Sequence, residues 1–112
     1  LGTDTFLANY EKNAAPHDFY FLRFAIGGAE RIKPETRRAW AEKFGVRLFE
    51  GYGTTEAAPV VTVNSPMYYK AGTIGRALSC QDVKLQAVEG IKNGAELVVR
   101  GINVMLGYVK EE

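Results

Sequence analysis

A buried strand, an amphipathic helix and a second strand follow one another in the first half of this chain. Residues 22–26 (LRFAI) are apolar enough for a buried strand, which the pair Gly27-Gly28 ends abruptly. Pro34 suits the first turn of a helix, and Gly45 is placed to cap its end. Residues 46–50 (VRLFE) read as the second strand. Strand, helix and strand within about 30 residues predict a βαβ unit with two parallel strands.

The second half of the chain consists of short β-prone runs separated by glycines. Residues 60–63, 83–88 and 96–100 each carry the β-branched and apolar residues of a strand. Short strands between glycine turns are typical of an antiparallel sheet or of part of a barrel. The glycines that separate the runs are Gly72, Gly75, Gly90, Gly94, Gly101 and Gly107.

These patterns predict an α/β chain with two units. Residues 1–63 are expected to form the end of an α/β subdomain that contains the parallel βαβ unit. Residues 64–112 are expected to form part of a small β-rich subdomain, a distorted antiparallel barrel-like lobe.

Composition removes several classes of function. The net charge of +1 gives no bulk attraction to nucleic acid, so we expect no nucleic-acid partner. One histidine and one cysteine, His17 and Cys80, cannot build a zinc site, and a single cysteine forms no internal disulfide. No Gly-Lys-Ser/Thr ending of a phosphate-binding Walker loop occurs in the chain.

Two glycine-containing stretches follow directly after the two predicted parallel strands. The first is residues 27–30 (GGAE) and the second is residues 50–56 (EGYGTTE). In an open parallel sheet, ligands bind beyond the carboxyl ends of the strands, where these two stretches would meet. The alternative is that each stretch is only a turn, with Glu56 as an ordinary surface residue.

The residue types of the second stretch suit a nucleotide. The ring of Tyr52, between two glycines, offers a face on which a base can stack. Thr54 and Thr55 supply hydroxyls, and the glycines supply amides, for phosphate oxygens. The carboxylate of Glu56 is a hard oxygen ligand of the kind that Mg²⁺ prefers.

Two later stretches are less specific. Residues 72–76 (GTIGR) predict a tight loop in which Arg76 either binds an anion or pairs with a surface carboxylate. Residues 96–108 (ELVVRGINVMLGY) form a strand, a glycine turn and an apolar segment, which predicts hydrophobic core.

Taken in order, the four stretches resemble the AMP-forming adenylate synthetase superfamily of acyl-CoA synthetases, luciferases and peptide-synthetase adenylation domains. Residues 52–56 are similar to its Tyr-Gly-x-Thr-Glu core, and residues 28–30 to its adenine loop. Residues 72–76 resemble its Gly-x-x-Gly-x-Pro loop, although Ala77 departs from that pattern. Residues 96–108 resemble its Gly-Glu-Leu motif, with Ala95 where glycine is usual.

The resemblance implies ATP or AMP and Mg²⁺ as cofactors, and it assigns roles to residues. Tyr52 would stack on adenine, Thr55 would bind the α-phosphate, and Glu56 would hold Mg²⁺, so that Thr55 and Glu56 are the implied catalytic residues. Ala57, Ala58 and Val60 are implied to line part of the acyl site. The residues implied to contact the nucleotide are Gly28, Ala29, Glu30, Glu50, Gly51, Tyr52, Gly53, Thr54 and Thr55.

Within the superfamily, residues 5–7, 51–61, 64–67 and 88–91 look most like the acyl-carrier-protein synthetase part of bifunctional 2-acylglycerophosphoethanolamine acyltransferases. That likeness implies a fatty acid as substrate, acyl carrier protein or CoA as acceptor, and a lysophospholipid as partner of the parent enzyme. It also implies a cytoplasmic location, or the cytoplasmic face of the inner membrane. The alternatives are a long-chain fatty acyl-CoA ligase, a non-catalytic nucleotide-binding module, and a structural interaction surface.

Three parts of the superfamily's site do not occur in these 112 residues: the lysine-containing phosphate loop, the ribose-binding aspartate and the C-terminal domain with its catalytic lysine. We therefore expect the chain to be a fragment of a longer enzyme and to be inactive by itself.

Overall fold

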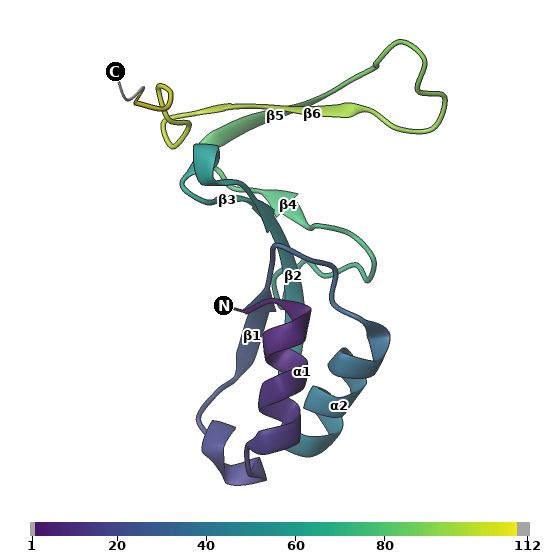
Figure 1. The fold of residues 1–112 in the computed structure, drawn as a ribbon, viewed down its shortest axis with the longest axis vertical. Coiled ribbons are helices and arrows are strands. Elements are labelled where there is room, and N and C mark those ends of the chain that lie inside the picture. The colour runs from purple at the N-terminus through teal and green to yellow at the C-terminus, as the bar shows by residue number, and fades with distance from the viewer. Residues whose placement is uncertain (1, 110–112) are drawn as a thin grey trace.

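The fold combines a pair of helices, a mixed sheet and a β-ribbon, as Figure 1 shows for the computed structural model, which describes residues 2–109. The helices pack side by side against the first two strands, and the ribbon extends from the opposite end of the sheet. In chain order the elements are α1 (Asp4–Asn13), the 3₁₀ turn η1 (Pro16–Phe19), β1 (Phe24–Gly27), α2 (Pro34–Phe44), β2 (Arg47–Gly53), the 3₁₀ turn η2 (Thr55–Ala57), β3 (Val60–Val63), β4 (Arg76–Ala77), β5 (Gln81–Gln86) and β6 (Glu96–Gly101).

The predicted βαβ unit is confirmed. β1 and β2 pair in parallel, from Phe24 opposite Arg47 to Gly27 opposite Glu50. Between them, α2 begins at Pro34 and ends before Gly45, which caps the helix with a left-handed φ of 66°. The fold is therefore α/β, as the sequence predicts.

One face of the β1–β2 pair carries the main hydrophobic core. Trp40 of α2 and Leu7 of α1 are buried together, and the indole Nε1 donates a hydrogen bond of 2.8 Å to the Leu7 carbonyl. A buried Trp usually has such a partner for its N–H, because an unpaired buried donor costs free energy. The core cluster is Leu7, Ile32, Trp40, Val46 and Leu48, with Phe19, Ala25 and Phe44 packed against it.

β1 is shorter and more exposed than the sequence predicts. It begins at Phe24 because the Leu22 amide is already used in a turn, donating to the Phe19 carbonyl at 2.9 Å. Phe24 is 43% exposed, so the expectation of a buried strand is wrong for its first half. Within residues 2–109 the outer edge of β1 pairs only through the isolated bridge from Gly2 to Gly27, so no further strand covers Phe24.

β2 is longer than predicted, because β3 folds back on its second half. β3 pairs antiparallel with residues 51–53, with an irregularity between Tyr52 and Gly53, and β4 pairs antiparallel with β3. The sheet order is β1-β2-β3-β4. β2 therefore has a parallel partner along its first half and an antiparallel partner along its second.

β5 and β6 form a separate antiparallel ribbon, with Gln81 opposite Gly101 and Gln86 opposite Glu96. The antiparallel character of the second half is confirmed, but two strands do not close a barrel, and within residues 2–109 this sheet has no third strand. β4 lies beyond residue 63 and extends the sheet of β1 to β3. The division of the chain at residue 63 stays a prediction.

The apolar segment after β6 is not core. Ile102 is 93% exposed and Leu106 is fully exposed, so the expectation of buried packing there is wrong. Polar contacts to η2, described below, hold this segment in place instead of hydrophobic packing. No helix among the described residues has the length and apolar character needed to cross a membrane.

Candidate functional site

A cavity of about 370 Å³ lies where β1 has ended and β2 continues. It brings together the two stretches that follow the parallel strands and adds the loop before β4, the third stretch noted in the sequence. The lining residues are Ala29, Glu30, Arg31, Glu50, Gly51, Tyr52, Gly53, Gly72, Thr73 and Ile74. The expected meeting of the first two stretches is confirmed for Ala29, Glu30 and residues 50–53, which line the cavity together.

The loop after β1 approaches the backbone of β2 closely. A Cβ atom on Gly28 would lie 3.6 Å from the Gly51 carbonyl oxygen, an ordinary contact. The next residue, Ala29, has a left-handed φ of 67°, a conformation that is unfavourable for a residue with a side chain. Strained residues of this kind concentrate where the surrounding structure holds a loop for a ligand.

Three carboxylates pin this loop through its neighbours. Glu30 Oε1 accepts from the Thr5 amide at the start of α1 at 2.9 Å, Asp4 Oδ1 accepts from the Lys33 amide at 3.0 Å, and Glu50 Oε1 accepts from the Ile32 amide at 3.0 Å. The bond from the Thr5 amide, together with the Thr3 hydroxyl, lowers the pKa of Glu30. The Glu30 carboxylate therefore binds the start of α1. Glu30 lines the cavity with its carbon atoms and its backbone instead.

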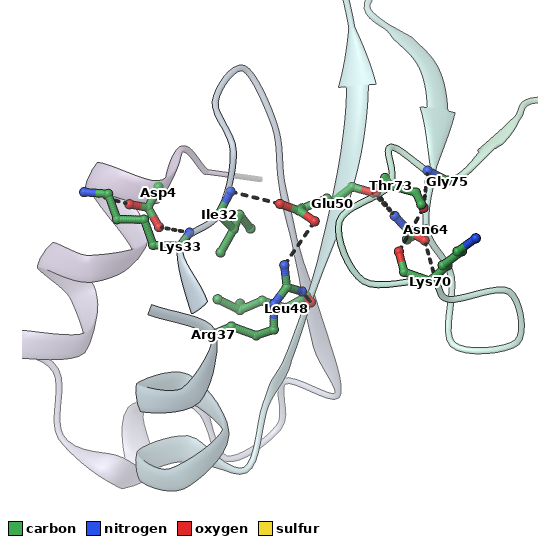
Figure 2. A network of polar contacts seen from close by, with 10 residues as sticks. All are labelled: Asp4, Ile32, Lys33, Arg37, Leu48, Glu50, Asn64, Lys70, Thr73 and Gly75. Atoms are coloured by element: carbon green, nitrogen blue, oxygen red, sulfur yellow. Dashed lines mark hydrogen bonds and ion pairs between the residues drawn. The ribbon is translucent and has the colours of Figure 1, made fainter. Parts of the chain in front are cut away.

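Glu50 is the centre of the network that Figure 2 shows. It is 7% exposed, and its Oε2 lies 3.0 Å from an Arg37 guanidinium nitrogen, while a second Arg37 nitrogen donates to the Leu48 carbonyl at 2.7 Å. On the other side, its carbonyl accepts from the Asn64 amide at 2.8 Å. Glu50, predicted as a nucleotide contact, directs its carboxylate toward α2 and fixes the position of β2.

The end of β2 is shaped by a close backbone approach. A Cβ on Gly53 would lie 1.9 Å from the Pro59 carbonyl oxygen, so only glycine fits there. The Thr54 amide donates to the same Pro59 oxygen at 2.7 Å. Tyr52, one residue earlier, remains 41% exposed and lines the cavity.

Thr54, Thr55 and Glu56 leave the sheet and do not line this cavity. Thr54 precedes η2, and its hydroxyl accepts from the Glu56 amide at 3.4 Å and donates to Glu56 Oε2. The Tyr108 hydroxyl donates to Glu56 Oε1. The hydrogen bond from the Thr54 hydroxyl lowers the pKa of Glu56 most, the bond from Tyr108 comes second, and together they bring it to about 2. An exposed, ionised carboxylate therefore lies just after β2.

The hydrogen bond from the Tyr108 hydroxyl to Glu56 was not predicted from the sequence. We call residues 102–108 the strap. Met105 of the strap donates its amide to the Glu56 carbonyl at 2.8 Å, and the Asn103 side chain donates to the Ala57 carbonyl. The signal available in the sequence was the polar Asn103 and the Tyr108 hydroxyl within a stretch that was assigned wholly to the core.

The remaining predicted residues lie apart from the cavity. Ala57 is buried in η2, Ala58 is exposed with a φ of 47°, and Val60 is half-buried opposite Gly53 in β3. Their proximity to an acyl group stays a prediction. Arg76 stacks its guanidinium over the Tyr68 ring at 3.8 Å, a cation–π contact that neither of the two predicted roles included.

The donor set around Glu56 fits a magnesium ion that is held chiefly by phosphates. Among the described residues no three or more His, Cys, Asp or Glu side chains gather into a metal cage. Mg²⁺ needs no such cage, because it keeps several waters and binds one or two carboxylates together with substrate phosphates. An ionised, exposed Glu56 between two hydroxyls meets that requirement.

A cavity at the carboxyl ends of parallel strands, lined by an exposed aromatic ring, is the place where α/β proteins with open sheets bind their ligands. The sequence pattern of the AMP-binding enzyme family matches residues 3–109, and the chain belongs to that family.

Curated relatives of the chain include fatty acid–CoA ligases. A long-chain fatty acid–CoA ligase of Yersinia pestis is 38% identical over 96 residues, which are 81% of this chain and 17% of the ligase. The human long-chain fatty acid–CoA ligase 6 is 33% identical over 95 residues, covering 80% of this chain and 14% of the ligase.

The crystal structure of a long-chain fatty acid–CoA ligase from Archaeoglobus fulgidus superimposes with a TM-score of 0.79 and 28% identity over 98% of this chain and 26% of that one. The chain thus spans about a sixth of the curated relatives in length. These relatives favour the fatty acyl-CoA ligase, the alternative in the sequence analysis, over the acyl-carrier-protein synthetase.

Proposed function

We propose that the protein to which these residues belong activates a fatty acid with ATP to give an acyl-adenylate, and then passes the acyl group to the thiol of CoA. The cavity beside Tyr52 carries this proposal, because it joins both predicted nucleotide stretches at one edge of the sheet. The CoA acceptor is taken from the relatives, which are fatty acid–CoA ligases.

In this proposal the base of the nucleotide lies in the cavity and stacks on the exposed Tyr52 ring. Gly28 presents backbone without a side chain, so a flat ring can approach the main chain there. The corresponding space at Gly51 and Gly53 is taken by the carbonyls of Thr62 and Pro59, so these two residues would contact the nucleotide through their other backbone atoms. In the same proposal Thr55, at the start of η2, binds the α-phosphate, and Ala57, Ala58 and Val60 line part of the acyl site.

Glu56 would hold the magnesium ion, which supplies neutralisation of phosphate charge when bound. Its carboxylate is ionised at neutral pH, and the Thr54 hydroxyl, which is the first cause of its lowered pKa, orients it. Catalysis in such a site depends on positioning and on electrostatic stabilisation of the developing charge.

The chemistry has two steps. A carboxylate oxygen of the fatty acid attacks the α-phosphorus of ATP, the bond from that phosphorus to the bridging oxygen breaks, and pyrophosphate leaves. The thiol sulfur of CoA then attacks the acyl carbonyl carbon, the thiol loses its proton, and AMP leaves with the electrons of the acyl–oxygen bond.

The test uses the full-length protein. Fatty-acid-dependent exchange of labelled pyrophosphate into ATP measures the first step, and we expect it with fatty acids and not without them. Glu56→Gln should reduce the exchange rate about 100-fold, the scale of losing one electrostatic group in a preorganised site. Glu42→Gln, the same change on the exposed face of α2, is the matched control.

The acceptor is tested by adding CoA or phosphopantetheinylated acyl carrier protein to the preformed acyl-adenylate. Thioester formation with CoA alone supports the ligase. Thioester formation with the carrier protein alone would replace the acceptor in this proposal with that of the acyl-carrier-protein synthetase, whose further partner is a lysophospholipid. Absence of exchange with every fatty acid tried would refute the first step.

A further inference from the structure

We infer that Tyr108 is a positioning residue for the adenylation reaction, holding the Glu56 carboxylate in one orientation from the strap. This inference rests on the proposed function, because Tyr108 would orient the carboxylate that holds the magnesium ion in that reaction. It is carried by the contacts between the strap and η2, which join parts of the chain 52 positions apart.

The contacts hold both the backbone and the side chain of Glu56. The Met105 amide donates to its backbone carbonyl at 2.8 Å, which places the strap alongside η2. The Asn103 side chain donates to the carbonyl of the following residue, Ala57, and anchors the strap a second time. These two bonds position the backbone of Tyr108 so that its hydroxyl reaches the carboxylate.

The two carboxylate oxygens of Glu56 then each receive one hydroxyl. Tyr108 donates to Oε1 and Thr54 donates to Oε2. Two oxygens offer about four lone-pair sites, so two hydrogen bonds leave about two sites for a cation. Glu56 is exposed and on a short turn, and without these donors its side chain would sample several rotamers.

A hydrogen bond from outside the metal shell that fixes a ligating carboxylate is worth about 10- to 100-fold in metal affinity or activity. Tyr108→Phe removes only the hydroxyl and keeps the ring. We expect it to weaken the magnesium-dependent binding of ATP by about 10-fold while leaving the binding of ATP without magnesium unchanged.

The experiment measures binding in the full-length protein, so that it does not depend on turnover. Calorimetry gives the ATP affinity of wild type, Tyr108→Phe and the control Tyr20→Phe, each with and without Mg²⁺. Tyr20 is 78% exposed and follows η1, outside the strap and η2, so its variant should match wild type under both conditions.

A second measurement tests the contact directly. The protein is labelled with 3-fluorotyrosine, the fluorine resonance of residue 108 is assigned by its loss in Tyr108→Phe, and its position is compared at constant pH between wild type and Glu56→Gln. We expect the resonance to move. A resonance that stays in place would show that the hydroxyl does not contact Glu56 and would overturn the inference.

The outcomes separate the two proposals. A moved resonance with equal magnesium dependence in Tyr108→Phe and wild type overturns the positioning role, because the contact then has no effect on the cation. ATP affinity that is independent of Mg²⁺ in wild type overturns it as well. Loss of pyrophosphate exchange with normal magnesium-dependent ATP binding refutes the proposed function and leaves the role of Tyr108 in cation binding supported.

Discussion

Removing the charge of Glu50 should loosen the βαβ unit even though this residue was first identified as a nucleotide contact. Glu50→Gln keeps the size and shape of the side chain, and its carbonyl oxygen still accepts from the Ile32 amide. The change replaces the ion pair with Arg37, at 3.0 Å, by a contact between an amide and a guanidinium.

The magnitude follows from the burial of the two groups. At 3.0 Å and an effective dielectric constant of about 20, the attraction is about 5 kcal/mol before desolvation is subtracted. The side chain of Arg37 is 24% exposed and that of Glu50 is 10% exposed, so desolvation removes much of this. A net loss of about 2 kcal/mol is expected, typical of a hydrogen bond to a charged group.

Native-state hydrogen exchange of the α2 amides in the full-length protein measures this loss as a fall in the opening free energy of the helix. Glu42→Gln on the exposed face of α2 is the control, expected within about 0.5 kcal/mol of wild type. Glu50→Ala should cost more, about 3–5 kcal/mol, because it also leaves the buried Ile32 amide without an acceptor. A loss for Glu50→Gln no larger than that of the control would refute the structural role of the ion pair.

The 112-residue chain by itself should give background rates of ATP–pyrophosphate exchange, and clear turnover would contradict the expectation that the site is incomplete. In the full-length protein, Glu56→Ala should remove most of the adenylation rate, about 100-fold, measured by the same exchange; near-normal exchange would exclude the magnesium role of that residue. Gly53→Ala should destabilise the β2–β3 region by about 2 kcal/mol or more, because the new methyl group meets the Pro59 carbonyl at 1.9 Å. Gly28→Ala introduces a contact of 3.6 Å and should be tolerated in thermal unfolding, and equal losses for the two glycine variants would show that the Pro59 carbonyl does not restrict the residue at position 53.

The sequence was most informative where structure is local. The bounds of α2 follow from Pro34 and Gly45, whose backbone preferences act within one turn of the chain. The parallel pairing of β1 and β2 followed from the order of elements, since a helical crossover leaves few other arrangements. The meeting of the two glycine stretches then followed from that pairing.

The sequence was least informative where contacts are distant or where burial depends on the neighbours of a segment. The bond from Tyr108 to Glu56 joins residues 52 apart, and no periodicity reports it. The apolar residues of the strap, such as Ile102, have the composition of core and yet are exposed in this chain. The carboxylate of Glu50 is directed away from the cavity because Arg37, on a different element, attracts it.

β1 ends at Gly27, and β2 continues for three more residues with β3 on only one side. Among the described residues no strand pairs with the other side of residues 51–53, which is therefore an open strand edge. A purine bound there would take the place of the missing strand, with the donors and acceptors along its rim facing the backbone as those of a neighbouring chain do. An insertion that lengthened β1 by two residues in register would compete for the same backbone groups, and the sheet would then close over the space that a ligand otherwise completes.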